Sequence, residues 1–310
     1  MGDYLIRPGS VFYVDNKLIV SDKIRDTLIH VIDARSQKYI KSMGVSGFGP
    51  NEIADTNGSF SAKLATPNYI WAYDTQQRRM SKFNLIENSD NRLAEEQFVF
   101  RSADFMSLRV VWTNSNTLLG LAFDGFSKFI EYDTIGNELQ RYGDYDNDLS
   151  KKYPKSVISH FYQGFLRANR ANDLFAQASI YADQIEVLNI EDNLITKIEG
   201  PLHLEPAFSV ASSGGYPVMA IDIDEAHYGY LDVFVGENYV YGLYSGKKWN
   251  GNPWGKGVCD IIYVFNLKGE VKKKFLLSDP IKTFTIDEPN GIIYGVSDGE
   301  EYDILQFNMQ

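Results

Sequence analysis

The sequence predicts a single all-β domain spanning residues 1–310, a six-bladed β-propeller with four antiparallel strands per blade. Two observations predict it. A short strand that ends in an apolar or aromatic residue followed by Asp or Asn recurs six times, at Ile32-Asp33, Phe83-Asn84, Tyr132-Asp133, Leu188-Asn189, Phe265-Asn266 and Phe307-Asn308. The intervals between these copies are 51, 49, 56, 77 and 42 residues, and a four-stranded blade takes about 40–50 residues.

Each Asp or Asn of the repeat has a physical role. Its short side chain can accept a hydrogen bond from the backbone two residues further on, and so start the turn into the next strand. Turn residues such as Gly136-Asn137 and Gly269 follow, and further strands are expected at 139–142 and 271–275. Lysines interrupt the strand at 271–275, as suits an exposed edge protected from aggregation. We therefore expect a hairpin at the outer edge of each blade.

An apolar strand precedes each copy of the repeat and is expected to be the second strand of its blade. Continuous apolar runs suit strands that are packed on both faces between neighbouring blades. The six runs are Leu18–Val20, Tyr69–Tyr73, Thr117–Leu121, Leu174–Ala176, Tyr239–Leu243 and Ile292–Val296.

The last blade lacks a fourth strand, because only two residues follow Phe307-Asn308. We expect Asp3 to Ile6 to supply it, which would join the two ends of the chain and remove the open edges between the first and last blades. The interval of 77 residues predicts a long insertion in blade five, at about 211–260.

Composition excludes several classes of protein. The formal net charge is −11 and no basic run is longer than Lys272-Lys273-Lys274, so nucleic acid is not an expected partner. The sequence holds no apolar stretch of the roughly 18 residues that a membrane helix needs. Met1-Gly2-Asp3 leads directly into a strand-like segment without a signal peptide, as in a trimmed or mature form of an exported protein. We expect a monomer.

After the first blade the chain reads Gly44-Val45-Ser46-Gly47-Phe48-Gly49-Pro50-Asn51-Glu52. Together with the six repeats, this segment resembles the TolB-like six-bladed propellers of Bacteroidetes, which are similar to NHL-repeat propellers. The resemblance implies a periplasmic or cell-surface location, with a lipid-bearing N-terminal cysteine in the full-length form. Three glycines and a proline suit a tight crossover between blades. Glu52 is expected to cap that turn or, as the alternative, to contact a ligand.

Candidate binding residues lie on the loops that join second to third strands. In a propeller these loops share a face with the connections between blades, around the mouth of the central channel, where we expect the ligand. The candidates there are Arg25, Arg78, Asp124, Tyr181 and Asp298. Ordinary solvated surface is the competing interpretation.

The insertion and two histidines add further candidates. Trp249 and Trp254 lie in a Gly-rich segment and are expected to pack on a neighbouring blade or to stack on a sugar ring or a peptide. His160 and His203 precede or begin expected inner strands and could meet at the channel. Scattered histidines without a Cys partner are weak grounds for predicting a metal site, so we expect no metal and no cofactor.

Two classes of function remain open. We favour a non-catalytic module of the bacterial cell envelope that binds a glycan, a peptide or an envelope protein at the channel mouth. The alternative is a metal-dependent hydrolase resembling six-bladed lactonases, in which Glu52, Asp124 or Asp298 would help to hold a divalent cation. Whether the protein is an enzyme stays open, although no nucleophile elbow or phosphate-binding loop is present.

Overall fold

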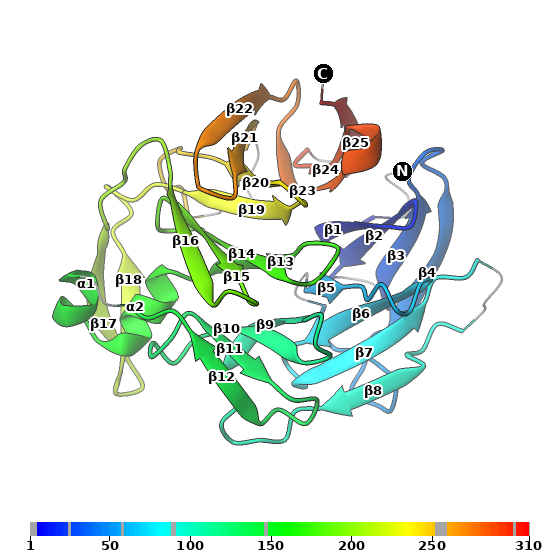
Figure 1. Ribbon diagram of the computed structural model, residues 1–310, viewed down its shortest axis with the longest axis horizontal. Helices are drawn as coiled ribbons and strands as arrows, with labels where there is room; N and C mark the ends of the chain where they lie inside the picture. Colours follow the sequence, from blue (N-terminus) through cyan, green and yellow to red (C-terminus); the bar gives the residue numbers. More distant parts are fainter. Residues whose placement is uncertain are drawn as a thin grey trace.

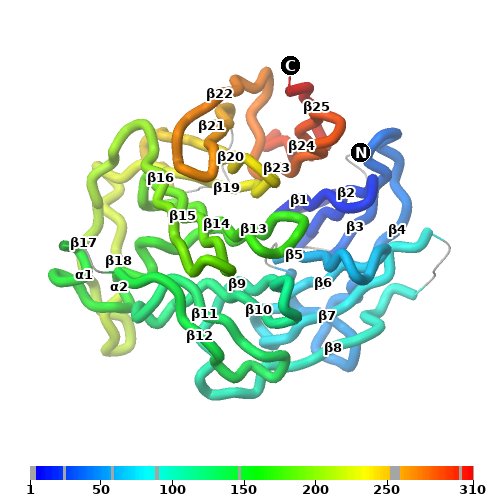
Figure 2. The backbone as a smooth tube through the Cα atoms, in the orientation of Figure 1, coloured from blue at the N-terminus to red at the C-terminus, as the bar shows by residue number. Residues whose placement is uncertain are grey.

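The computed structural model describes residues 5–23, 26–56, 59–87, 91–145, 148–251, 259–299 and 302–309. Six antiparallel sheets stand around a central axis, as Figure 1 shows, with the first strand of each sheet nearest the centre. This arrangement is a six-bladed propeller, as the sequence predicted. The tube in Figure 2 shows that the chain passes from blade to blade in sequence order, so that the last blade lies beside the first.

Five of the sheets have four strands among the described residues, and the sixth has three. The first three blades consist of β1 (Pro8–Val14), β2 (Lys17–Asp22), β3 (Thr27–Asp33) and β4 (Tyr39–Val45); β5 (Phe60–Ser61), β6 (Tyr69–Asp74), β7 (Arg79–Asn84) and β8 (Glu96–Val99); and β9 (Ser107–Trp112), β10 (Leu118–Ala122), β11 (Phe129–Tyr132) and β12 (Glu138–Tyr142). The last three consist of β13 (Gly164–Ala168), β14 (Leu174–Ser179), β15 (Gln184–Asn189) and β16 (Leu194–Glu199); β19 (Tyr230–Val235), β20 (Tyr239–Tyr244), β21 (Ile261–Asn266) and β22 (Val271–Leu276); and β23 (Ile281–Asp287), β24 (Ile292–Ser297) and β25 (Ile304–Asn308).

The repeated Asp or Asn lies at the end of the third strand of each blade or immediately after it. In the first five blades its side chain accepts a hydrogen bond from a backbone N–H group two or three residues further on, as expected. The Asn266 Oδ1 atom accepts hydrogen bonds from the backbone N–H groups of Lys268 and Glu270, at 3.1 and 2.9 Å. Asp133 accepts the equivalent bonds from Ile135 and Asn137. The side chain thus satisfies backbone donors that the turn would otherwise leave unpaired.

The long interval near blade five consists of separate parts. A two-stranded hairpin, β17 (Phe208–Ser213) and β18 (Tyr216–Ile221), lies between blades four and five, outside both of their sheets. Strands β19 and β20 of blade five follow it, and a loop after β20 completes the interval. The expected single insertion at 211–260 therefore consists of two separate features. One is the hairpin that begins at Phe208, before blade five, and the other is the loop between β20 and β21, the second and third strands of that blade.

Two short helices, α1 (Asp148–Lys152) and α2 (Lys155–Phe161), connect blades three and four, and a 3-10 turn, η1 (Glu288–Asn290), follows β23. The hairpin β17–β18 packs on α2 through a buried cluster that includes Phe161 and Met219. Figure 1 shows α1, α2, β17 and β18 together at one side of the ring.

The start of the chain contacts blades one and six. Leu5 is buried in a cluster with Tyr294, Val296 and Ile304 of blade six, and the Ile6 N–H group donates to Asp22 in blade one. Neither Leu5 nor Ile6 belongs to a strand. The expected closing strand from Asp3 to Ile6 is therefore not formed by its described residues, and Asp3 lies outside the part of the chain that the structure describes.

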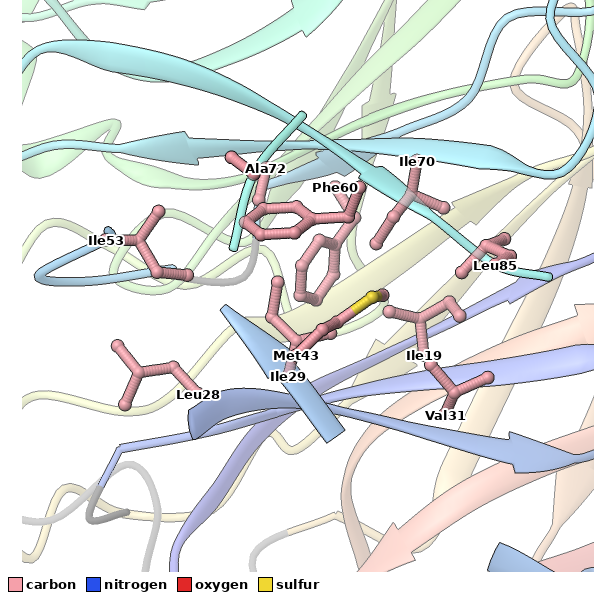
Figure 3. Packing of buried hydrophobic residues seen from close by; sticks show 12 residues of the cluster. Ile19, Leu28, Ile29, Val31, Met43, Ile53, Phe60, Ile70, Ala72 and Leu85 are labelled. Carbon is pink, nitrogen blue, oxygen red and sulfur yellow. The ribbon is translucent and has the colours of Figure 1, made fainter. Parts of the chain in front are cut away.

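The hydrophobic core lies between adjacent blades. Figure 3 shows Ile19 and Ile29 of blade one facing Phe60 and Ile70 of blade two, and all four side chains are buried. Full burial of such a side chain stabilises the fold by about 1.5–3 kcal/mol. The second strands are buried on both faces, which explains why their sequences read as continuous apolar runs.

Candidate ligand-binding cavity

A cavity of about 540 Å³ lies where the innermost strands of five blades end. The ends of β1, β5, β13, β19 and β23 line it, together with the loops that lead from these strands into the second strands of their blades. The cavity thus forms one mouth of the central channel. Clefts of about 300–1,000 Å³ are typical of small-molecule sites.

This mouth is on the face opposite to the one that the sequence analysis selected. In an antiparallel blade, the loop between the first and second strands lies at the other end from the loop between the second and third strands. None of the candidate residues that the structure describes lines the cavity. The loops that do line it include the turn at Asp15 and Asn16, which reads in the sequence as an ordinary β-turn.

Aromatic side chains form much of the cavity wall. They come from three blades and comprise Phe12, Tyr13, Phe60, Tyr69, Phe234, Tyr239 and Tyr241. Phe12 and Phe60 bring blades one and two into contact, with ring centroids 6.4 Å apart. Tyr239 is 41% exposed, and Leu64, which also lines the cavity, is 61% exposed. The cavity therefore offers apolar surface to an incoming molecule.

The acidic side of the cavity consists of Glu237 in blade five and Glu288 in blade six. The Glu288 carboxylate accepts hydrogen bonds from the Tyr241 hydroxyl and from the Glu237 N–H group, both at 3.3 Å. Burial is the main reason why the pKa of Glu288 is raised, and the charge of Glu237 adds to the effect. A Cβ atom on Gly236 would lie 2.0 Å from Glu288 Oε1, so a larger residue there would force this carboxylate to move.

The basic side of the cavity consists of Lys63 and Arg170, and both side chains have partners. The Lys63 Nζ atom donates to Asn116 Oδ1 at 2.5 Å and lies 4.0 Å from the centre of the Trp112 ring. Burial lowers the pKa of Lys63. Arg170 pairs with Asp15 at 3.6 Å on the exposed rim.

Further along the innermost strands, charged side chains form the channel wall. The Arg167 guanidinium of β13 pairs with the buried Asp232 carboxylate of β19, at 3.1 Å. Thr283 of β23 donates to the same carboxylate, and Arg109 of β9 lies over the Phe165 ring. Burial, together with the charge of Arg167, lowers the pKa of Arg109 to about 10. These contacts tie the blades together at the axis.

On the other face, several sequence candidates have structural roles. Glu52 accepts a hydrogen bond from the Gly49 N–H group at 2.8 Å, so it caps the crossover turn as the first interpretation proposed. Asp124 pairs with Arg141 at 2.7 Å. Arg78 is exposed, with a left-handed φ of 49°. Asp298 is almost fully buried in blade six, next to the blade's second strand.

Three candidates do come together on that face. The His160 and Tyr181 rings meet edge to face with centroids 5.8 Å apart, and Tyr181 lies 5.5 Å from Trp249. Trp249 also packs on Tyr228, at 4.5 Å. Trp249 therefore packs within the protein, which was the favoured of the two expectations for the tryptophans.

The remaining candidates are dispersed or undescribed. His203 is exposed and lies 3.7 Å from Glu199, so it does not meet His160. Arg25 and Trp254 lie outside the described residues.

No metal centre is evident in the described part of the chain, where no group of three or more His, Cys, Asp or Glu side chains is placed to hold an ion. Glu52, Asp124 and Asp298, which the hydrolase alternative would bring together, have separate surroundings. Among the described residues, no helix has the length and apolar character that crossing a membrane requires.

Comparisons with known proteins agree with the fold. The family model described as TolB-like 6-blade propeller-like matches residues 3–289. No curated protein matches the sequence. A member of the DUF4221 family from Bacteroides vulgatus is similar in structure, with a TM-score of 0.58 and 12% identity over 98% of this chain and 94% of that one.

Two further solved structures resemble the chain. One is a protein from Bacteroides fragilis, provisionally described as exported, with a TM-score of 0.55 and 12% identity over 97% of this chain and 89% of that one. The other is the Cps50 (Swd1) β-propeller domain of Myceliophteria thermophila, with a TM-score of 0.51 and 8% identity over 98% of both chains. At these identities the likeness concerns the fold alone.

Proposed function

The chain belongs to the TolB-like 6-blade propeller-like family, and from this premise we propose that it is a non-catalytic binding protein whose ligand occupies the channel-mouth cavity. The observation that carries the proposal is the cavity itself. Five blades contribute to its wall, and it combines aromatic surface with a few polar groups, which is the usual composition of a ligand site.

The proposal keeps the channel mouth that the sequence analysis favoured but places the ligand on the other face. There, exposed Tyr239 and Leu64 border a hollow large enough for a small molecule or a peptide side chain. On the face selected earlier, Trp249 and Tyr181 are already packed on each other and on neighbouring rings. These two rings are therefore partly covered by protein contacts.

We further propose that the protein works in the bacterial cell envelope as a monomer, and that its full-length form carries a lipid anchor that ligand binding does not require. The family resemblance and the similar fold of a protein described as exported support this location. Fractionation of the native host with an antibody to the protein tests it, and a purely cytosolic protein would refute it. Labelling with a radioactive fatty acid tests the lipid anchor of the full-length form.

A binding screen tests the proposed function. Calorimetry with purified protein and a panel of glycans, short peptides, amines and carboxylates should yield at least one ligand with a dissociation constant below about 1 mM, which corresponds to a binding free energy of roughly −4 kcal/mol. Tyr239→Ala and Leu64→Ala should each weaken that ligand by about threefold to tenfold, because a buried contact is commonly worth around 1 kcal/mol.

The matched controls are Tyr216→Ala and Leu194→Ala. Both side chains are exposed and lie outside the cavity lining. They should leave the affinity unchanged. A panel with no ligand, or a ligand whose affinity is indifferent to Tyr239→Ala and Leu64→Ala, would overturn the proposed function.

A further inference from the structure

We propose that the acidic side of the cavity recognises an organic cation, namely an ammonium or guanidinium group on the ligand, which docks between Glu237 and Glu288 and against Phe234, Tyr239 and Tyr241. This inference rests on the proposed function and names the chemical class of the ligand. The site would take an amine, a guanidine, or a peptide that presents a lysine or arginine side chain.

The first argument is the state of Glu288. Its carboxylate is half-buried and accepts two hydrogen bonds, yet within the described part of the chain no Lys, Arg or His forms an ion pair with it or with Glu237. A buried negative charge without a positive partner is unfavourable. A ligand cation would provide that partner.

The second argument is the placement of the aromatic rings. Phe234 and Tyr241 are directly opposite each other in the β19–β20 pair, and their rings meet edge to face at 5.8 Å. Tyr239 lies two residues before Tyr241 on the same strand, so its side chain is on the same face. Aromatic faces attract organic cations through their quadrupole. One hairpin thus presents three rings on the face that bears the Tyr241 contact to Glu288.

The third argument is the asymmetry of charge across the cavity. Lys63 is engaged by Asn116 and Trp112, and Arg170 by Asp15. The two carboxylates on the acidic side have no such cationic partner among the described residues. The partners of Lys63 are neutral and Asp15 offsets Arg170, so one lysine faces two glutamates. The net charge of the cavity lining is therefore negative, which favours a positive ligand over an anionic one.

An organic cation also fits better than a bare metal ion. Calcium and magnesium require about six oxygen ligands, whereas aromatic carbon forms much of the wall around Glu288. The rings would cover the alkyl chain of an amine, and the carboxylates would bind its charged end.

Calorimetry with matched probes tests the inference. N-acetyl-lysinamide and N-acetyl-argininamide carry the cation, and N-acetyl-norleucinamide is the neutral analogue of the lysine probe. We expect at least one cationic probe to bind wild-type protein at least tenfold more tightly than the norleucine probe. Glu288→Gln, which keeps an acceptor for the Tyr241 hydroxyl, should remove this preference.

Glu199→Gln is the control variant, because Glu199 is an exposed carboxylate outside the cavity that pairs with Lys197. It should leave the preference intact. Thermal melting of both variants verifies that they fold. Binding by 1,5-diaminopentane, compared with the peptide Gly-Lys-Gly, then distinguishes a free amine from a lysine side chain as the source of the cation, and either result with Glu288 dependence supports the inference.

Equal affinity for the norleucine and lysine probes, or a preference that survives Glu288→Gln, would overturn the inference. If a neutral ligand from the wider panel still binds and loses affinity in Tyr239→Ala, the proposed function stands and only the ligand class is wrong. If neither the cationic probes nor any member of the panel binds, both proposals fail.

Discussion

Arg167 and Asp232 form a buried ion pair between the innermost strands of blades four and five. The Arg167 Nη2 atom lies 3.1 Å from Asp232 Oδ1 and 3.2 Å from Oδ2, and Thr283 of blade six donates to the same carboxylate. One aspartate therefore connects three blades at the channel axis.

Replacing Asp232 by Ala should destabilise the fold by about 3–5 kcal/mol, because it leaves the Arg167 charge buried without this partner. Guanidinium denaturation followed by circular dichroism measures the loss. Glu199→Ala is the surface comparison, since its pair with Lys197 is exposed and should contribute less than about 1 kcal/mol. Equal effects of the two substitutions would contradict the structural role of Asp232.

Asp22 and Asp74 each accept backbone hydrogen bonds from the chain segment that leads into the blade containing that aspartate. Asp22 accepts hydrogen bonds from the N–H groups of Ile6 and Arg7, and Asp74 accepts one from Ala54 at 2.6 Å. Asp74→Ala should cost about 1–3 kcal/mol, since it leaves buried backbone donors unsatisfied. Urea denaturation tests this, with Asp104→Ala on the exposed surface as the neutral comparison.

Gly236→Ala should weaken binding in the cavity without unfolding the protein. The added methyl group would lie 2.0 Å from Glu288 Oε1 and would displace the carboxylate. We expect the affinity for the cationic probe to fall at least threefold in calorimetry. Asn238→Ala changes an exposed residue of the same loop that also lines the cavity but adds no atom near Glu288, so it should reduce the affinity less. An unchanged affinity in Gly236→Ala would show that the position of this carboxylate is unimportant.

The raised pKa of Glu288 predicts a pH dependence of stability with a defined sign. A carboxyl group whose pKa is higher in the folded protein costs stability when it is ionised, so its penalty appears as the pH rises from the unfolded pKa to the folded pKa. Tyr241 and the Glu237 N–H group stabilise the ionised form in part, and the Glu237 charge opposes it. Glu288→Gln should therefore stabilise the protein at pH 7.

This stabilisation should vanish below a pH of about 4, where the carboxyl group is protonated in both states. Denaturation curves of wild type and Glu288→Gln between pH 3.5 and about 7.5 measure the difference. A variant that is equally stable or less stable than wild type at pH 7 would contradict the prediction.

Trp249→Ala tests which of the two faces of the propeller binds the ligand. Trp249 packs on Tyr181 and Tyr228, away from the cavity lining. The substitution should destabilise the protein by roughly 2–4 kcal/mol because it removes a large packed ring, and it should leave cavity binding unchanged at temperatures where the variant is folded. A loss of affinity larger than that in Tyr239→Ala would place the ligand on the other face.

The sequence by itself determined the number of blades and the second and third strands of each blade. Asn266 and Asp133 start turns through local hydrogen bonds, so their effect is visible in the residues next to them. The apolar run at Leu118–Leu121 is buried on both faces, and its continuous apolar composition predicts this burial. These are local consequences of side-chain chemistry, and they repeat with each blade.

Only the tertiary structure decided where the cavity lies and which side chains meet in it. Glu288 and Tyr241 are 47 residues apart in the sequence, and Phe12 meets Phe60 only because blades one and two are neighbours. The space between such residues depends on how six sheets close around an axis, and no single segment encodes that distance. Strand pattern is a property of neighbouring residues, whereas a cavity is the space that distant residues leave between them.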